Sequence, residues 1–123
     1  MQSNFAVDTQ TAEGAITLAL RGELDLVSVP ALEQAIEGQP QQDVELIVLD
    51  LRGLEFMDST GLHAVLRIAN GAHDTGRRFA LIRGPDQVHR LFELTGLAES
   101  LTIVDSPEQL VEGWTPPEPT VTP

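Results

Sequence analysis

The stretch LIVLDLRGLEFMDSTGLHAVLRIANGA, residues 46–72, changes its hydrophobic period midway, and this change predicts a strand followed by a helix. Residues 46–49 form an unbroken apolar run ending at Asp50, which is typical of a central strand covered on both faces. We expect a short loop from Arg52 to Met57. From Gly61 to about Ala72 the apolar residues recur at helical spacing, and one face holds Leu62, Val65, Leu66 and Ala69. This pattern predicts an amphipathic helix packed on the sheet.

The residues before this stretch predict a hairpin and a first helix. Apolar residues alternate with smaller or polar ones in residues 5–7 and 16–20, around a turn at Glu13 and Gly14, which indicates two antiparallel strands. Ser28 can cap a helix that has Pro30 in its first turn and Gly38 at its end. The sheet should therefore begin with a meander.

The residues after this stretch continue the alternation of strands and helices. Residues 79–82 predict another buried strand, and a helix follows with Val88, Leu91 and Phe92 on one side. Residues 103–104 predict a last strand, and the residues from Ser106 match the start of a final short helix around Leu110 and Val111. We expect an α/β fold: a mixed, mostly parallel sheet of about five strands, with an N-terminal antiparallel hairpin and about four helices.

The length of 123 residues suits a single domain. We expect this domain to span residues 1–114. Residues 115–123 are rich in Pro and Thr, so we expect a disordered tail there.

The composition excludes several kinds of site and partner. There is no cysteine, so disulfides, thiolate metal sites and a cysteine nucleophile are excluded. The formal net charge of -12 should repel nucleic acid and anionic membranes, and it favours a partner with a basic or neutral face; an acidic surface that serves solubility alone is the alternative. No signal peptide and no apolar run of roughly 20 residues is visible, so we expect a cytoplasmic protein without a membrane span.

The segment FMDSTG, residues 56–61, is the most informative candidate site. It lies where the amphipathic helix begins, and there the backbone N–H groups lack helical partners and the helix dipole is positive. A hydroxyl at that point, on Ser59 or secondarily on Thr60, is suited to carry a phosphate. The alternative is that Asp58 or Ser59 only caps the helix.

Other residues yield weaker hypotheses. Gly61, Ala64 and Ile68 form a stripe beside the core face, and small residues there would let a partner's backbone approach; the alternative is that the stripe merely flanks the core. We expect the three histidines, at positions 63, 73 and 89, to be surface residues, and the phenylalanines, at positions 5, 56, 79 and 92, to be core residues. No third group accompanies Ser59 and His63 in a hydrolase triad, and no metal-ligand spacing or phosphate-binding glycine motif occurs. We therefore expect neither an enzyme nor a bound metal or cofactor.

Three segments together resemble the STAS-domain family of bacterial anti-sigma factor antagonists. GELD at residues 22–25 looks like the loop after the family's second strand, FMDSTG like its phosphorylation loop, and RLFELTGL at residues 90–97 like its third helix and following turn. The resemblance runs from the hairpin to the last helix and implies the STAS fold.

This resemblance also implies a regulatory cycle. The unphosphorylated protein would bind an anti-sigma factor with serine kinase activity and release a sigma factor, phosphorylation of Ser59 would block binding, and a serine phosphatase would reset the protein. Glu23 and Asp25 would lie near Ser59 in the docking face, together with Asp58, Thr60, Gly61, Ala64 and Ile68. The alternative for the two loop carboxylates is that they are solvated turn residues.

The sequence leaves one rival function open. A STAS interaction module in a signalling scaffold or a transporter complex would bind a partner without being phosphorylated. In either case we expect a monomer, because no heptad repeat or self-complementary patch is visible. The sequence does not identify the sigma factor, the kinase, the phosphatase, the upstream signal, any bound nucleotide or the role of the tail.

Overall fold

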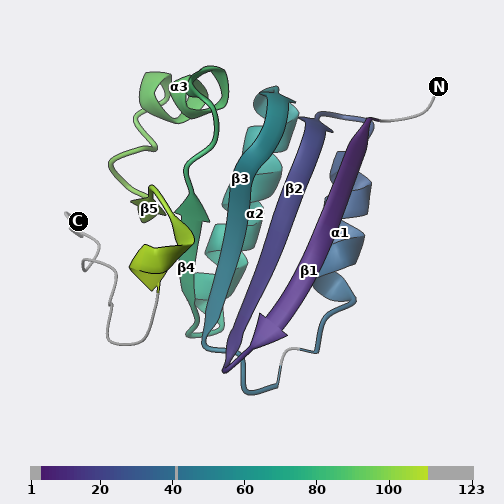
Figure 1. Cartoon of the computed structure of the whole chain (residues 1–123), viewed down its shortest axis with the longest axis vertical. Coiled ribbons are helices and arrows are strands. Elements are labelled where there is room, and N and C mark those ends of the chain that lie inside the picture. Colours follow the sequence, from purple (N-terminus) through teal and green to yellow (C-terminus); the bar gives the residue numbers. More distant parts are fainter. Residues whose placement is uncertain (1–3, 41, 111–123) are drawn as a thin grey trace.

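The computed structural model describes residues 4–40 and 42–110, and within these ranges five strands form one sheet in the order β1-β2-β3-β4-β5 (Figure 1). The strands are β1 (Phe5–Ala12), β2 (Ala15–Leu24), β3 (Leu46–Met57), β4 (Arg78–Ile82) and β5 (Ile103–Val104). The helices are α1 (Val29–Glu37), α2 (Ser59–Asp74) and α3 (Asp86–Leu94), and a 3-10 turn, η1 (Pro107–Leu110), follows β5.

The predicted hairpin and the mostly parallel sheet are confirmed. β1 pairs antiparallel with β2, and each later pair of neighbouring strands is parallel. The hairpin turns at Glu13 and Gly14, which both have positive φ, 50° and 82°, as a tight turn between antiparallel strands requires. Glycine at the second position adopts this conformation without strain.

The number of helices differs from the prediction of about four. The described residues form three α-helices, and the predicted last helix appears as η1, where the Gln109 amide bonds the Ser106 carbonyl at 3.2 Å. This i→i+3 bond closes a single 3-10 turn, because four residues are too few to propagate an α-helix. Val111, the predicted domain boundary at residue 114 and the predicted tail at 115–123 lie outside the described residues.

β3 is longer than predicted, because residues 52–57 remain paired with β2. The register shifts between Ala19 and Arg21 and again between Gly22 and Glu23, so β3 carries an extra residue at each irregularity. Gly53 allows one of these close approaches, since a Cβ there would lie 2.8 Å from the Leu20 carbonyl oxygen. The expected loop from Arg52 to Met57 is therefore wrong.

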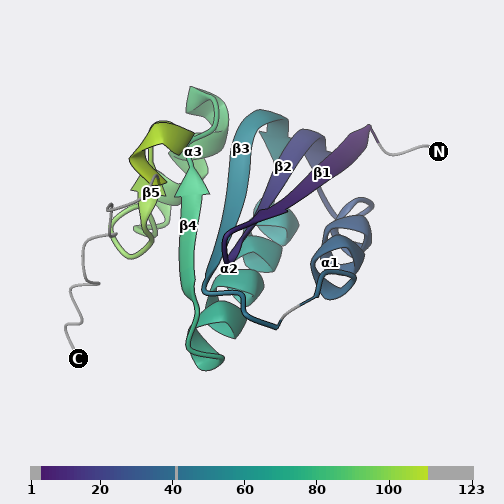
Figure 2. The ribbon, with the colours of Figure 1, turned by 60° about the horizontal axis from the view of Figure 1, so that its bottom comes forward.

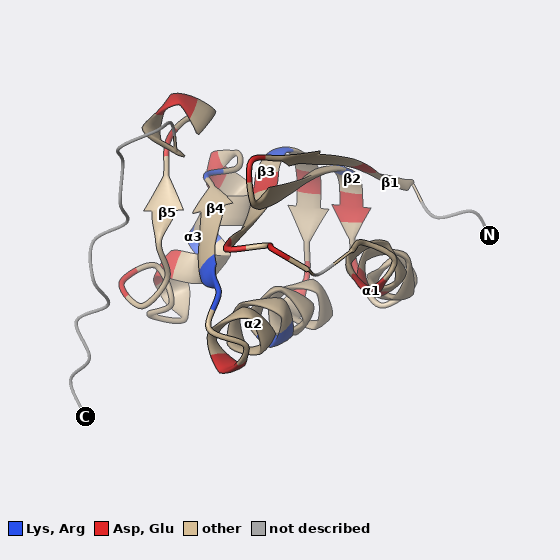
Figure 3. Cartoon of the chain, turned by 90° about the horizontal axis from the view of Figure 1, so that it is seen from below, with Lys and Arg blue, Asp and Glu red and all other residues tan. Residues whose placement is uncertain are grey.

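The helices divide the molecule into layers (Figures 2 and 3). α1 and α2 lie on one face of the sheet, and η1 lies on the other. The larger core cluster fills the space between the sheet and the helices, with Leu20, Leu49 and Phe92 at 0% exposure. A smaller cluster of Val48, Ile82 and Val104 lies apart from it.

This arrangement brings two loops to one edge of the sheet. β2 and β3 are parallel neighbours, so their carboxyl ends meet at the upper edge in Figure 1, where both α1 and α2 begin. Leu24, the last residue of β2, pairs with Met57, the last residue of β3. The segments that follow these two strands therefore start side by side, and they contain the predicted site.

Candidate functional site

Asp58 caps the N-terminus of α2. Its backbone is extended, at φ -100° and ψ -175°, and its Oδ1 accepts a hydrogen bond of 2.9 Å from the Gly61 amide. The Asp58 carbonyl accepts the first helical bond, from the Leu62 amide at 3.0 Å. The capping role left open between Asp58 and Ser59 is thus filled by Asp58.

Ser59 is the first residue of α2, and its side chain is exposed. Asp58 provides the helix cap, and among the described residues the Ser59 hydroxyl makes no hydrogen bond. The hydroxyl therefore stands at the positive end of the helix dipole, where an added phosphate finds backbone N–H groups and solvent without displacing a core side chain. Thr60, the secondary candidate, is half-buried.

The loop after β2 lies directly against this helix start. The Asp58 amide donates a hydrogen bond of 3.3 Å to the Leu24 carbonyl. Gly61 also faces this carbonyl, and a Cβ at Gly61 would lie 2.5 Å from its oxygen. The structure therefore brings Glu23 and Asp25, on either side of Leu24, next to Asp58 and Ser59, as the family resemblance implied.

The two loop carboxylates differ in their surroundings. Glu23 is exposed and pairs across the sheet with Phe56. Asp25 is half-buried, and its Oδ1 accepts hydrogen bonds from the Val27 amide, the Ser28 amide and the Ser28 hydroxyl, each at 3.1 Å. The Asp25 carboxylate therefore stabilises the conformation of its own loop, whereas the Glu23 side chain is exposed to solvent.

The stripe of Gly61, Ala64 and Ile68 is buried, so the hypothesis that a partner's backbone contacts it is corrected. Gly61 is buried against the Leu24 loop, Ala64 is 0% exposed, and Ile68 is 9% exposed. The small size of Gly61 serves this close approach within the molecule. Ala64 belongs to the main core cluster, so a partner's backbone cannot reach it without disrupting the fold.

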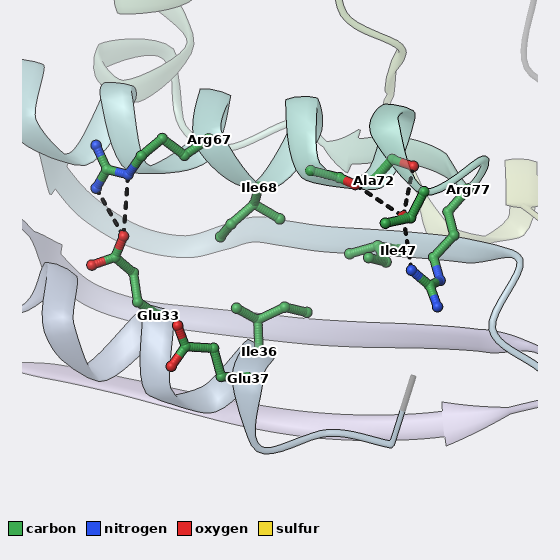
Figure 4. Close-up of a pocket in the computed structure, with 10 residues that line it drawn as sticks. Glu33, Ile36, Glu37, Ile47, Arg67, Ile68, Ala72 and Arg77 are labelled. Atoms are coloured by element: carbon green, nitrogen blue, oxygen red, sulfur yellow. Dashed lines mark hydrogen bonds and ion pairs between the residues drawn. The ribbon is translucent and has the colours of Figure 1, made fainter. Parts of the chain in front are cut away.

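Ile68 lines a groove of about 650 Å³ between α1 and α2 (Figure 4). It points toward Ile36 of α1, above a floor that includes Ile47. Arg67 spans the groove and donates two hydrogen bonds to Glu33 Oε2, at 3.1 and 2.9 Å. Ile68 therefore lies along the helix pair and not in the surface around Ser59.

Two further predictions about side chains are wrong. Phe56, expected in the core, is 49% exposed, because the extra residue Glu55 in the bulge shifts the alternation so that Met57 instead of Phe56 faces the core. His89, expected on the surface, is only 9% exposed and packs near Phe92, with ring centroids 6.4 Å apart.

The sequence reasoning missed Leu26 and Val27, which are 72% and 62% exposed. They lie in the loop between β2 and α1, immediately after Asp25. Leu26 continues the alternation of Leu20 and Leu24, so the local pattern offered no signal that distinguishes it from the core side chains of the strand. Their exposure depends on where β2 ends, at Leu24, which the alternation alone does not show.

A different charged pair stands away from the site. Asp50 is buried, and Arg52 donates to its carboxylate oxygens at 3.0 and 2.8 Å. Burial alone would raise the pKa of Asp50, but the hydrogen bonds and the charge of Arg52 outweigh it and lower that pKa. Within residues 4–40 and 42–110 no cluster of three or more metal-ligating side chains occurs, and no described helix is long and apolar enough to cross a membrane.

Comparison with known proteins links this geometry to a family. Residues 6–110 match the model of the STAS domain. An anti-sigma-B factor antagonist of Staphylococcus aureus (strain NCTC 8325 / PS 47) is 28% identical over 105 residues, which cover 85% of this chain and 97% of that protein.

Solved structures show the same fold. An anti-sigma factor antagonist from Mycobacterium paratuberculosis is 26% identical with a TM-score of 0.75, over 85% of this chain and 89% of that one. The Bacillus cell fate determinant SpoIIAA in its phosphorylated form is 23% identical with a TM-score of 0.67, over 85% of this chain and 96% of that one.

Proposed function

This chain belongs to the STAS domain family, and from this premise we propose that it is an anti-sigma factor antagonist switched by phosphorylation of Ser59. In its unphosphorylated form it binds an anti-sigma factor with serine kinase activity and thereby releases a sigma factor in the cytoplasm. Phosphorylation of Ser59 blocks this binding, and a serine phosphatase restores it. The chain is the kinase's substrate and is not itself an enzyme.

One observation carries the proposal: an exposed serine begins α2 directly beside the loop of Glu23 and Asp25. The relatives named above are anti-sigma factor antagonists, which supports the same role for this chain. A kinase can reach the Ser59 hydroxyl without unfolding the helix, because Asp58 already provides the cap.

The local charges support a switch that acts on the surface. A phosphate would add about -1.5 to -2 charges beside Asp58 and the exposed Glu23. The backbone amides at the start of α2 can hold this charge, so the fold tolerates it. A partner that covers Ser59 would have to desolvate the dianion, and this cost would weaken the complex.

The test begins with capture of the partner. Unphosphorylated protein is used as bait in an extract of the native cell, and any anti-sigma factor that is retained is purified. Incubation of that factor with ATP and the wild-type protein should add one phosphate, which peptide mass spectrometry should locate on Ser59. Ser59→Ala should accept none, whereas Thr60→Ala should still be phosphorylated.

A second measurement tests the effect on binding. The phosphorylated protein should bind the purified anti-sigma factor more weakly than the unphosphorylated one. Retention of no anti-sigma factor, or binding that is equal in the two forms, would contradict the proposal.

A further inference from the structure

Exposed apolar side chains occur in the two segments that meet at the start of α2. Four large hydrophobic side chains are exposed among the described residues, and three of them belong to the two segments that meet at the start of α2. They are Leu26 and Val27 in the first segment and Phe56 in the second. Scattered exposed apolar residues need no explanation, but three in two adjoining segments indicate a contact surface.

Leu26 and Val27, here called the apolar loop tip, are held in place by hydrogen bonds of Asp25 and of the buried Ser28. Ser28 is 1% exposed, and its hydroxyl donates to the Glu23 carbonyl at 2.8 Å and accepts from the Asp25 amide at 2.8 Å. Asp25 Oδ1 accepts from the Val27 and Ser28 amides at 3.1 Å. The backbone on both sides of the tip is therefore fixed, and its apolar side chains are exposed to water.

This order lowers the cost of binding. A loop that is already held in one conformation loses little conformational entropy when a partner covers it. The apolar side chains then release water on association, which is the favourable term in most protein–protein contacts. The hydrogen bonds of Asp25 and Ser28 thus prepare the tip for a partner.

The charges beside the tip specify the partner's chemistry. Residues 23–28 and 55–60 contain four carboxylates, Glu23, Asp25, Glu55 and Asp58, and no lysine or arginine. A complementary surface presents an apolar pocket bordered by basic residues, since charges at the edge of an interface govern the choice of partner.

We propose that the apolar loop tip inserts into an apolar, basic-edged pocket of the anti-sigma factor, and that Asp25 is a positioning residue that holds the tip rather than a charged contact. This inference rests on the proposed function. It differs from the sequence hypothesis, in which Asp25 itself belonged to the docking face.

The first experiment removes the apolar surface. The affinity of the captured and purified anti-sigma factor is measured by calorimetry for the unphosphorylated wild type and for the double variant Leu26→Ser, Val27→Ser. Loss of two apolar contacts should raise Kd by about tenfold or more. Leu94→Ser is the matched control, because Leu94 is also apolar and is 77% exposed. The Gln87 end of α3 lies near the site, since the Gln87 side chain donates a hydrogen bond to the Glu55 carbonyl, and Leu94 lies at the opposite end of this helix. Its Kd should not change.

The second experiment separates positioning from charge. In Asp25→Asn the amide oxygen can replace Oδ1, which accepts the hydrogen bonds from the Val27 amide, the Ser28 amide and the Ser28 hydroxyl. This variant should therefore bind with nearly the wild-type Kd. Asp25→Ala loses the acceptor and should raise Kd by about tenfold, because the tip must then be ordered on binding. Circular dichroism checks that each variant is folded.

Each outcome decides between the two proposals. An unchanged Kd for the double serine variant overturns the apolar contact while leaving the phosphorylation switch intact, since the mass measurement tests the switch separately. If Asp25→Asn and Asp25→Ala weaken binding equally, Asp25 is a charged contact and its positioning role is overturned. Wild-type affinity in both variants also overturns the positioning role. Failure of the wild type to bind any anti-sigma factor overturns this inference together with the proposed function.

Discussion

The amide of Asp58 donates a hydrogen bond to the carbonyl of Leu24 at 3.3 Å, and this bond ties the start of α2 to the loop after β2. It joins two segments that are more than thirty residues apart in the chain. Both segments carry acidic side chains and both precede a helix, so together they contain a serine, several carboxylates and three exposed apolar residues.

The charge at position 59 should govern binding. Ser59→Ala should bind the anti-sigma factor constitutively, whereas Ser59→Glu should lose about 1 kcal/mol or more of binding free energy, because a carboxylate must be desolvated at the interface. Calorimetry with the purified anti-sigma factor measures both. Thr11→Glu is the control for added charge, since Thr11 is exposed on β1 near the hairpin turn. Equal affinity of the alanine and glutamate variants would contradict the prediction.

Two glycines of α2 should respond in opposite directions to alanine. Gly61→Ala should lower the free energy of unfolding by about 2 kcal/mol, because the new Cβ would overlap the Leu24 carbonyl oxygen. Gly71→Ala should raise it by about 0.5 to 1 kcal/mol, since the Cβ meets no atom within 4 Å and alanine favours the helix. Urea unfolding of both variants provides the comparison. A loss at Gly71 as large as that at Gly61 would argue against the close approach.

Ala64 should tolerate no charge. Ala64→Arg should unfold the protein or lower its Tm sharply, because a guanidinium would enter a core position of 0% exposure. The neighbouring His63 is exposed, so His63→Arg should leave Tm nearly unchanged. Thermal melts followed by circular dichroism test the pair. A folded Ala64→Arg variant with the wild-type Tm would restore the surface stripe predicted from the sequence.

The Asp50–Arg52 pair should stabilise the protein only while Asp50 is ionised. The pKa of Asp50 is lower in the folded state than its ordinary value of 3.8, so the contribution is complete above that value and is lost as the pH falls through the folded-state pKa. Asp50→Asn should cost roughly 1 kcal/mol at neutral pH, a modest amount because Arg52 is half exposed to water. The free energies of unfolding of the wild type and of Asp50→Asn, measured with urea from neutral pH into acid, should become equal as the pH falls below 3.8 and Asp50 is protonated. A difference that persists unchanged in acid would rule out this ionisation.

Local patterns predicted most of the fold correctly. The change of period at residues 46–72 located β3 and α2, and the alternation around Glu13 and Gly14 located the hairpin. Local chemistry narrowed the helix cap to Asp58 or Ser59, because both side chains can bond the first free amides of a helix, and the structure shows that Asp58 fills this role. Ser59 was predicted at the helix start because it lies between the apolar strand and the residues with helical spacing.

The errors arose where contacts from other segments decide the outcome. The arc of α2 that is buried includes Ala64 and Ile68, because α2 packs against α1 as well as the sheet, and a helical period assumes a single packing face. The bulges in β3 turn Phe56 outward and extend the strand to Met57, since their register depends on the pairing with β2. Neither pairing is visible in a local pattern.

By itself the sequence determined the order of the elements, the acidic character of the chain and the position of Ser59 at the start of a helix, because these depend on local spacing, residue charge and helix capping. Only the tertiary structure decided that the Leu24 loop lies against this helix, that the small residues of α2 are buried, and that Leu26 and Val27 are exposed. Parallel pairing of β2 with β3 is the physical reason for the first, since it brings the carboxyl ends of both strands, distant in the chain, to the same edge of the sheet. Contacts between α2 and α1, also distant in the chain, account for the buried arc of α2.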